Sequence, residues 1–361
     1  MSTRYRIAVV AGDGVGPEVV PIGMRVLEEA AGGAFVLDWQ ELSWGSDHYL
    51  RTGRMMPEDA LETLRSFDAI YLGAVGSPKV PDHVTLWGLL LPIRQGFDLY
   101  VNLRPIKLLP GVRGPLRDKG PEHIDMLCVR ENTEGEYAGV GGRSHVGFAH
   151  EVALQVDVFT RTGVERVVRY AFGLARNRRG RLASITKSNA SPYSYVLWDE
   201  VVADVAPEFP DVEVTRLLVD AAAALFVTRP EQFDVLVASN LFADILTDLG
   251  AAIQGSMGLA ASANVNPDGD YPGLFEPVHG SAPDIAGQGI ANPIGTVWAG
   301  ALMLEHLGEP EAAKRVITAI EAVLAAGVAL PRDLGGDATT PEVGDALLAA
   351  LRGAAADVAR R

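Results

Sequence analysis

Residues 235–249 read Val-Leu-Val-Ala-Ser-Asn-Leu-Phe-Ala-Asp-Ile-Leu-Thr-Asp-Leu, a short apolar run followed by a longer amphipathic segment. The run is typical of a buried strand, Val235–Ala238, and the spacing of the apolar residues after it predicts a helix over Leu241–Leu249. Other short apolar runs alternate with amphipathic segments in the same way: Ile7–Val10 before Pro17–Ala31, and Ala69–Leu72 after Pro57–Ser66. This alternation predicts an α/β fold with a largely parallel sheet.

Two carboxylates lie on the predicted helix. Asp244 and Asp248 stand one turn apart on the same face, so their oxygens could share one hard cation, Mg²⁺ or Mn²⁺. A solvated acidic face is the alternative, since like charges at this spacing cost only about 0.2–0.5 kcal/mol. Upstream, Asp220 lies in an apolar run where an unpaired charge would be costly, so we expect a metal or a lysine to accompany it.

Three arginines lie close together in the sequence. Arg94, Arg104 and Arg130 could pair their guanidinium groups with carboxylates, so their convergence would suit a dicarboxylate substrate. Taken singly, each is more often a solvated surface residue. The apolar surroundings of Arg104 and Arg130 weaken that alternative for these two.

A lysine and a tyrosine are candidates for proton transfer. Lys187 follows the apolar run Leu182–Ile185, and Tyr137 closes the segment Glu134-Gly-Glu-Tyr137. A lysine beside a cation has a lowered pKa and can act as a base, and a tyrosine can deliver a proton. The local sequence of neither residue is diagnostic by itself.

Two glycine-containing segments could bind a dinucleotide. Gly12–Glu18 lies between a predicted strand and helix, but its third glycine comes one residue too early for the Rossmann fingerprint, so a tight turn without a ligand is the alternative. The loop Leu274–Ile285, followed by Asn292, offers free backbone N–H groups for phosphates and Asp284 for ribose hydroxyls. A structural surface loop is the alternative there, yet its length and polar character make it the better candidate.

The composition limits the class of protein. With 361 residues and 48% hydrophobic residues, the chain predicts two domains, although no linker marks a boundary. A formal charge of −15 without any basic block argues against nucleic acid, and an anionic substrate would need locally gathered basic residues. The single cysteine, Cys128, lies in a predicted strand and suits a reducing compartment. Because neither a signal peptide nor a spanning apolar stretch is evident, we expect a cytoplasmic protein.

Two further regions have a distinct pattern. Gly139–Gly147 is glycine-rich and precedes the strand-like segment His150–Phe159, which together predict a protruding hairpin. Glu311–Arg361 is rich in Ala, Glu and Leu and predicts surface helices with a break near Pro331–Gly336.

Together these segments resemble, in order and over nearly the whole chain, the β-decarboxylating dehydrogenase family of isopropylmalate, isocitrate, homoisocitrate and tartrate/D-malate dehydrogenases. The tartrate/D-malate branch is the most similar, through Met55-Met-Pro57, Phe67–Tyr71, Leu86-Trp-Gly88, Arg130–Tyr137 and Val237–Asn240. The resemblance implies an isopropylmalate-dehydrogenase-like two-domain α/β fold with a long mixed, largely parallel sheet, and not a regular Rossmann fold. It places residues 1–102 and 257–361 in a large cofactor-binding domain. Residues 103–256 form a central dimerisation and metal/substrate domain, with an arm near 139–160.

The implied activity is NAD-dependent oxidative decarboxylation of a small 2-hydroxy dicarboxylate, either D-malate to pyruvate and CO₂ or tartrate. The alternative within the family is 3-isopropylmalate dehydrogenase of leucine biosynthesis. A catalytically silent binding protein is the alternative from another class, but it would be expected to lack Lys187, Asp244 or Asp248, and all three are present.

The resemblance also implies residue roles in a homodimer with shared sites. Lys187 is the base, Tyr137 the proton donor, and Asp220 both a catalytic residue and a metal ligand; Lys187 and Asp220 come from the partner subunit. Mg²⁺ or Mn²⁺ is bound by Asp220, Asp244 and Asp248, and K⁺ is a further possible cofactor. The substrate is bound by Arg94, Arg104, Arg130, Trp87 and Leu90. NAD is bound by Glu276, His279, Gly280, Ser281, Ala282, Asp284, Ile285 and Asn292.

Overall fold

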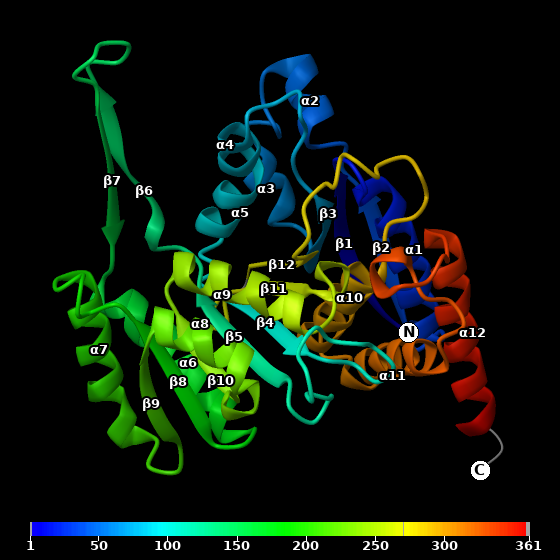
Figure 1. Cartoon of the computed structure of the whole chain (residues 1–361). Coiled ribbons are helices and arrows are strands. Elements are labelled where there is room, and N and C mark those ends of the chain that lie inside the picture. Colours follow the sequence, from blue (N-terminus) through cyan, green and yellow to red (C-terminus); the bar gives the residue numbers. More distant parts are fainter. Residues whose placement is uncertain (1, 270, 359–361) are drawn as a thin grey trace.

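A ten-stranded mixed sheet forms the centre of the molecule (Figure 1). The computed structural model of the chain describes residues 2–269 and 271–358. Strand β11 is antiparallel to both of its neighbours, β12 and β4, and β4 is antiparallel to β5, whereas all other pairs are parallel. The order across the sheet is β2 (Phe35–Glu41), β1 (Thr3–Gly12), β3 (Ala69–Ala74), β12 (Gly273–Pro277), β11 (Ala261–Val265), β4 (Val101–Lys107), β5 (Asp125–Glu131), β10 (Val235–Ala238), β8 (Arg181–Thr186) and β9 (Glu213–Leu218). The predicted α/β fold with a long, largely parallel sheet is confirmed.

Helices cover both faces of this sheet. On β1, Ile7 and Val9 belong to the apolar core that includes α1, α10, α11 and α12, whereas Ala8 and Val10 belong to a second core. This alternation follows from the two-residue period of a strand, and it lets one strand serve two layers. The helices are α1 (Gly16–Ala31), α2 (Ser46–Thr52), α3 (Ala60–Leu64), α4 (Asp82–Thr85), α5 (Leu91–Gly96), α6 (Arg161–Arg176), α7 (Ser194–Val205), α8 (Val219–Thr228), α9 (Asn240–Ile253), α10 (Ile294–His306), α11 (Pro310–Ala326) and α12 (Thr340–Val358).

Most predicted elements are present. Strand β10 has the predicted bounds, and α9 extends the helix predicted over Leu241–Leu249 by one residue before it and four after it. The helix predicted over Pro57–Ser66 is shorter, because α3 comprises only Ala60–Leu64. The two C-terminal helices are separated as predicted. They also contribute to the core, since Val316 and Ile320 of α11 are fully buried. Cys128 is a buried thiol on β5, as predicted.

A two-stranded antiparallel sheet stands apart from the main one. It pairs β6 (Gly135–Ser144) with β7 (Val152–Val158) and projects from the body as an arm (Figure 1). Its large apolar side chains are exposed: Val140, Val146, Phe148, Val152, Leu154 and Val156. Because an isolated two-stranded ribbon is at best marginally stable in water, this surface is suited to a partner.

We propose that the domain boundary runs between β11 and β4. Strands β2, β1, β3, β12 and β11 come from the two ends of the chain, and strands β5, β10, β8 and β9 come from its middle. This order supports the division into residues 1–102 with 257–361 and residues 103–256. None of the helices in the described ranges is long and apolar enough to cross a membrane.

Candidate active site

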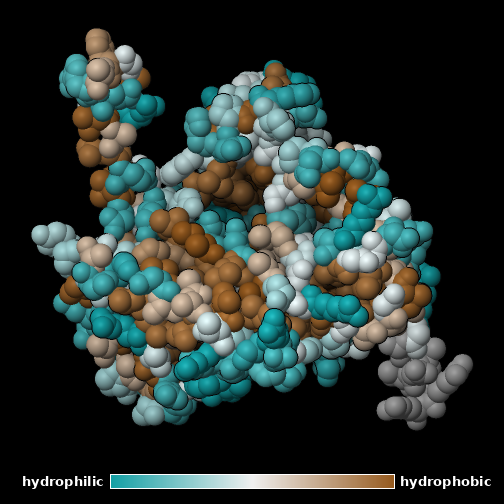
Figure 2. All heavy atoms as spheres, viewed as in Figure 1, coloured by the Kyte–Doolittle hydropathy of each residue, from teal (hydrophilic) through white to brown (hydrophobic). Residues whose placement is uncertain are grey.

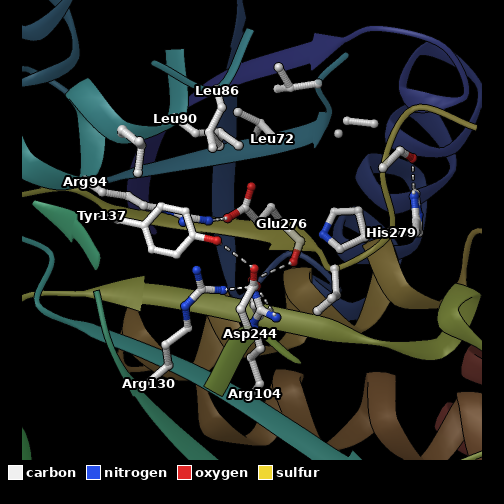
Figure 3. Close-up of a pocket in the computed structure, with 18 residues that line it drawn as sticks. Leu72, Leu86, Leu90, Arg94, Arg104, Arg130, Tyr137, Asp244, Glu276 and His279 are labelled. Atoms are coloured by element: carbon white, nitrogen blue, oxygen red, sulfur yellow. Dashed lines mark hydrogen bonds and ion pairs between the residues drawn. The ribbon is translucent and has the colours of Figure 1, made fainter. Parts of the chain in front are cut away.

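A cavity of about 180 Å³ lies where β3, β12, β11, β4 and β5 meet the segment 86–94 (Figure 3). One side of it is apolar, with Leu72, Leu86, Leu90 and Leu91. The opposite side is charged and polar, and it is lined by Arg94, Arg104, Arg130, Tyr137, Asp244, Ser262, Glu276 and His279.

The three predicted arginines all line this cavity, although they come from three different elements. Arg94 lies near the end of α5, Arg104 on β4 and Arg130 on β5, and each is at most 6% exposed. A buried guanidinium needs partners to compensate its desolvation. The surface alternative is therefore wrong for all three, and the acidic chain does gather positive charge at one place.

Each arginine has a polar partner. Arg94 donates to Glu276 Oε1 at 2.6 Å, and Arg104 donates through Nε to Asn102 Oδ1 at 2.7 Å. Arg130 donates to Asn240 Oδ1 through Nε at 3.0 Å and through a terminal nitrogen at 2.6 Å. These contacts fix the planes of the guanidinium groups. Arg94 Nε is buried and has no hydrogen-bond partner among the described residues.

Asp244 is the acidic centre of the cavity. Figure 3 shows Arg104, Arg130 and the Tyr137 hydroxyl converging on its carboxylate. Burial by itself would raise the pKa of Asp244, but the nearby guanidinium groups of Arg130 and Arg104 outweigh it, and the pKa is lowered. Asp244 therefore stays charged between two positive groups.

Asp248 lies one turn further along α9. Its pKa is raised, first by burial and then by the negative charge of Asp244. A divalent cation near both carboxylates would relieve this repulsion, and two hard oxygen donors suit Mg²⁺ or Mn²⁺. No group of three or more His, Cys, Asp or Glu side chains in the described part of the chain is close enough to hold a metal.

The third predicted ligand lies elsewhere. Asp220, at the start of α8, accepts a hydrogen bond from Lys187 Nζ at 2.6 Å, and neither residue lines the cavity. The hydrogen bond from Lys187 lowers the pKa of Asp220. The expected lysine partner is present, but the argument from burial was wrong, because the Asp220 side chain is 65% exposed.

Tyr137 enters the cavity from the base of the arm. Its hydroxyl donates to Asp244 Oδ2 at 3.3 Å, and Arg130 lies 5.7 Å from the centre of its ring. Burial and the charge of Asp244 raise the pKa of Tyr137. The hydroxyl is therefore held in its protonated form at neutral pH.

Part of the predicted cofactor loop also lines the cavity. Glu276, His279 and Gly280 do so, and His279 Nε2 has no hydrogen-bond partner among the described residues. Burial lowers the pKa of His279, which favours the neutral ring. A neutral ring nitrogen at the edge of the cavity can bind a polar group of a cofactor.

The loop beyond Gly280 rests on the N-terminal glycine segment. Val15 donates to the Ser281 carbonyl at 2.9 Å, and a Cβ on Gly14 would lie 1.9 Å from that same oxygen. Glu18 accepts hydrogen bonds from Gly287 N at 2.5 Å and Gly289 N at 2.7 Å. This explains the failed fingerprint: the glycine segment binds the chain's own loop.

The remaining loop residues divide into three kinds. Asp284 is exposed, whereas Ala282 and Ile285 pack beside Val15 and Val19. Asn292 is buried, and its amide is used within the chain, since Oδ1 accepts from Ile294 N at 2.9 Å and Nδ2 donates to Asp333 at 2.9 Å. Its cofactor contact stays a prediction.

Trp87 does not line the cavity, whereas Leu90 does. Trp87 is 40% exposed, and its ring lies against Gly139 at the base of the arm. It belongs to a π-helical turn, Leu86–Leu90, a rare structure often found at functional sites. This turn was not predicted, because hydrophobic spacing does not distinguish it from an α-helix.

Several polar residues of the site were also missed. Asn102 and Asn240 were not singled out, although Asn102 is two positions from Arg104 on a strand and Asn240 is four positions before Asp244 on a helix. Those spacings place each pair on one face and could have identified them. Thr247, which accepts from Arg104 at 2.6 Å, gave no comparable indication.

Comparisons with known proteins agree with this geometry. Residues 6–347 match the family described as isocitrate/isopropylmalate dehydrogenase. A probable tartrate dehydrogenase/decarboxylase of Agrobacterium vitis is 52% identical over 97% of this chain and 98% of its own length. The D-malate dehydrogenase (decarboxylating) of Escherichia coli is 52% identical over 96% and 98%. The 3-isopropylmalate dehydrogenase of Thermobifida fusca is 51% identical over 96% and 97%.

A solved structure shows the same architecture. The isocitrate dehydrogenase of Methylococcus capsulatus superimposes with a TM-score of 0.87 at 36% identity, covering 96% of this chain and 99% of its own. Both the sequence relationship and the fold extend over nearly the full length. The chain belongs to the isocitrate/isopropylmalate dehydrogenase family.

Proposed function

We propose that this protein is an NAD-dependent decarboxylating dehydrogenase of a small 2-hydroxy dicarboxylate, D-malate or tartrate. The observation that carries the proposal is the convergence of three buried arginines on one small cavity that also holds Asp244 and Tyr137. Such a concentration of positive charge is costly to bury unless a ligand with more than one negative charge compensates it. A dicarboxylate supplies that charge.

The opposite wall restricts the substituent at C3 of the substrate. Leu86, Leu90 and Leu91 offer no side-chain hydrogen bond for a third carboxylate, so isocitrate should bind poorly. D-malate carries only hydrogens at C3, and tartrate adds a hydroxyl. The names of two relatives at 52% identity support these substrates.

The same wall favours one second candidate. Leu86 could contact an isopropyl group, whose burial is worth about 0.8 kcal/mol per carbon. 3-Isopropylmalate is therefore the alternative substrate. Because the identities to the named relatives are nearly equal, kinetics must decide between the two.

The family implies a nicotinamide cofactor and a divalent metal, and the residues fit both. His279 and the loop to Ile285, with Asn292, would hold NAD, and Asp244 and Asp248 with Asp220 of a second subunit would hold Mg²⁺ or Mn²⁺. When bound, NAD accepts a hydride and the metal acts as a Lewis acid on the substrate oxygens. K⁺ is a further proposed cofactor.

The chain's own residues would orient the substrate and move protons. Arg94, Arg104 and Arg130 would hold the substrate carboxylates from the positions that their partners in the chain give them. Lys187 of the second subunit would accept the hydroxyl proton. Tyr137, kept protonated by its raised pKa, would deliver a proton to the carbon that loses CO₂.

We further propose a homodimer. Lys187 and Asp220 do not line the cavity of their own chain, and the Asp220 side chain is 65% exposed, so the pair is accessible to a second copy. Figure 2 shows apolar side chains gathered over α8 and α9, where Val227 is 44% and Ile245 59% exposed. A second copy on this surface would cover those side chains and bring the pair next to Asp248.

The test is steady-state kinetics with NAD and Mg²⁺ or Mn²⁺ on D-malate, the tartrate isomers, isocitrate and 3-isopropylmalate. We expect the highest kcat/KM with D-malate or a tartrate, and CO₂ release with D-malate. A preference for 3-isopropylmalate would establish the alternative. No turnover of any of the four would overturn the proposed function.

A further inference from the structure

Four cross-strand partners form a row across the middle of the sheet, on β12, β11, β4 and β5. They are Leu274, Asn264, Asn102 and Arg130. Asn264 and Asn102 are both fully buried at its centre, and Asn102 is the last residue before the proposed domain boundary. Buried amides in neighbouring strands are costly unless every polar atom is paired.

Asn264 satisfies this requirement completely. Its Oδ1 accepts from Asn102 Nδ2 at 2.8 Å and from Asn132 Nδ2 at 3.0 Å. Its Nδ2 donates to the Leu274 carbonyl at 3.0 Å and to Glu276 Oε1 at 3.0 Å. Four partners on one amide leave it a single orientation.

These partners lead directly to two of the arginines. Asn264 binds Glu276 Oε1, which also accepts a hydrogen bond from Arg94. Asn264 also binds Asn102, which accepts a hydrogen bond from Arg104 Nε. Arg94 belongs to one proposed domain and Arg104 to the other. Asn264 thus links both arginines, through Glu276 to Arg94 and through Asn102 to Arg104.

We infer that Asn264 is a positioning residue for the substrate, resting on the proposed function. It sets the Arg94 and Arg104 guanidinium groups at a fixed separation, so that both carboxylates of the dicarboxylate are bound without rearrangement. Ordering two long side chains in advance removes an entropic cost from binding. A displacement of about 1 Å in such groups can cost two orders of magnitude in rate.

Asn264→Asp is the sharpest variant, because it is isosteric. The new oxygen would face Glu276 and the Leu274 carbonyl, both acceptors, so the link to Arg94 breaks while Asn102 and Asn132 keep their acceptor. Asn264→Ser is a second variant with a smaller, uncharged side chain. Its substrate binding is measured if the aspartate variant does not fold. Gln254→Leu is the matched control: Gln254 is also a fully buried amide and binds strand β4 through Lys107 N at 3.1 Å, but it contacts none of the arginines.

Two measurements separate positioning from stability: the Kd of D-malate with Mg²⁺ by calorimetry, and KM for D-malate and NAD at a temperature where every variant is folded. We expect Asn264→Asp and Asn264→Ser to weaken D-malate binding at least about tenfold and to raise KM for NAD by a smaller factor, through Glu276 of the predicted cofactor segment. Gln254→Leu should lower the unfolding temperature but leave both KM values unchanged. Wild-type affinity for D-malate in folded Asn264 variants would overturn the inference, as would an equal loss of NAD and D-malate binding. If the wild type itself binds none of D-malate, tartrate and 3-isopropylmalate, the proposed function fails instead.

Discussion

Lys187 Nζ and Asp220 Oδ1 lie 2.6 Å apart in the same chain, yet neither residue reaches the cavity that holds Asp244. An ion pair in which the Asp220 side chain is 65% exposed contributes little to the stability of one chain. The relationship fits a pair that is delivered to a second subunit as a unit.

Subunit mixing tests this directly. The variants Lys187→Ala and Asp248→Ala are each expected to be inactive, but a mixed dimer would contain one intact site, because each chain supplies what the other lacks. Random exchange should restore roughly a quarter of wild-type activity. Mixing Lys187→Ala with Asp220→Ala is the control and should restore nothing, since both defects lie in the same donated pair. Equal recovery of activity in both mixtures would contradict shared active sites. So would the absence of recovery in both mixtures after subunit exchange has been verified.

Asp244→Asn should abolish activity and the response to metal. The helix tolerates asparagine, but Arg130 and Arg104 would lose their shared carboxylate. We therefore expect about 1–3 kcal/mol lower stability, less than for a fully buried pair because 37% of the Asp244 side chain is exposed. In wild type, D-malate with Mg²⁺ should raise the unfolding temperature, and in the variant it should not. A wild-type metal response in Asp244→Asn would contradict the ligand assignment.

The same variant has a defined pH dependence. The folded-state pKa of Asp244 is lowered, so its charge stabilises the fold above the unfolded-state pKa of about 4, and this contribution is lost as the pH falls through the folded-state value. The difference in unfolding free energy between wild type and Asp244→Asn should therefore be largest at neutral pH and should disappear in acid. Denaturant unfolding of both proteins at pH 7 and below about pH 4 measures it.

The apolar wall should control substrate choice. Leu90→Ala makes room for an isopropyl group, so we expect the ratio of kcat/KM for 3-isopropylmalate over D-malate to rise about tenfold. Trp87→Glu should also raise this ratio, but by a smaller factor, because Trp87 does not line the cavity. Leu50→Ala, at an exposed leucine, is the control and should leave the ratio unchanged. An unchanged ratio in Leu90→Ala would show that this wall does not select the substituent at C3 of the substrate.

The cofactor loop should prefer NAD over NADP. Asp284 is exposed on the loop, where its charge would repel a 2′-phosphate, and Ile285 offers no compensating cation. A cost of about 3 kcal/mol corresponds to roughly 100-fold discrimination. Asp284→Asn should reduce this discrimination between NAD and NADP. Asp337→Asn makes the same charge change at another exposed position and should leave the discrimination unchanged. Equal wild-type kcat/KM values with both cofactors would refute the role of Asp284.

Glu18 should support the cofactor loop from α1. Glu18→Gln exchanges a carboxylate that accepts from Gly287 and Gly289 for an amide that can accept only through one oxygen. We expect KM for NAD to rise roughly tenfold, the equivalent of one charge-assisted hydrogen bond, with KM for D-malate nearly unchanged. Glu28→Gln on the same helix, where Glu28 binds Trp39, is the matched control. A larger effect on D-malate than on NAD would place Glu18 in a different role.

Much of the molecule could be predicted from local pattern. The strand Val235–Ala238 and the helix after it follow from apolar spacing, and the one-turn separation of Asp244 and Asp248 follows from helix geometry. The three arginines were found from residue type, because a guanidinium group pairs with carboxylates, and apolar neighbours argued against a surface position for Arg104 and Arg130. These conclusions require only the chemistry of neighbouring residues.

The partners of those residues were decided by tertiary structure alone. Arg94 binds Glu276 across 182 positions, Asn102 binds Asn264 across 162, and Glu18 binds Gly287 across 269. No periodicity in one sequence encodes such separations, because they depend on which strands become neighbours in the sheet. The position of Trp87 outside the cavity depends likewise on the π-helical turn and on Gly139 at the base of the arm. The sequence by itself determined which groups can do the chemistry, and strand order and packing determined which of them meet.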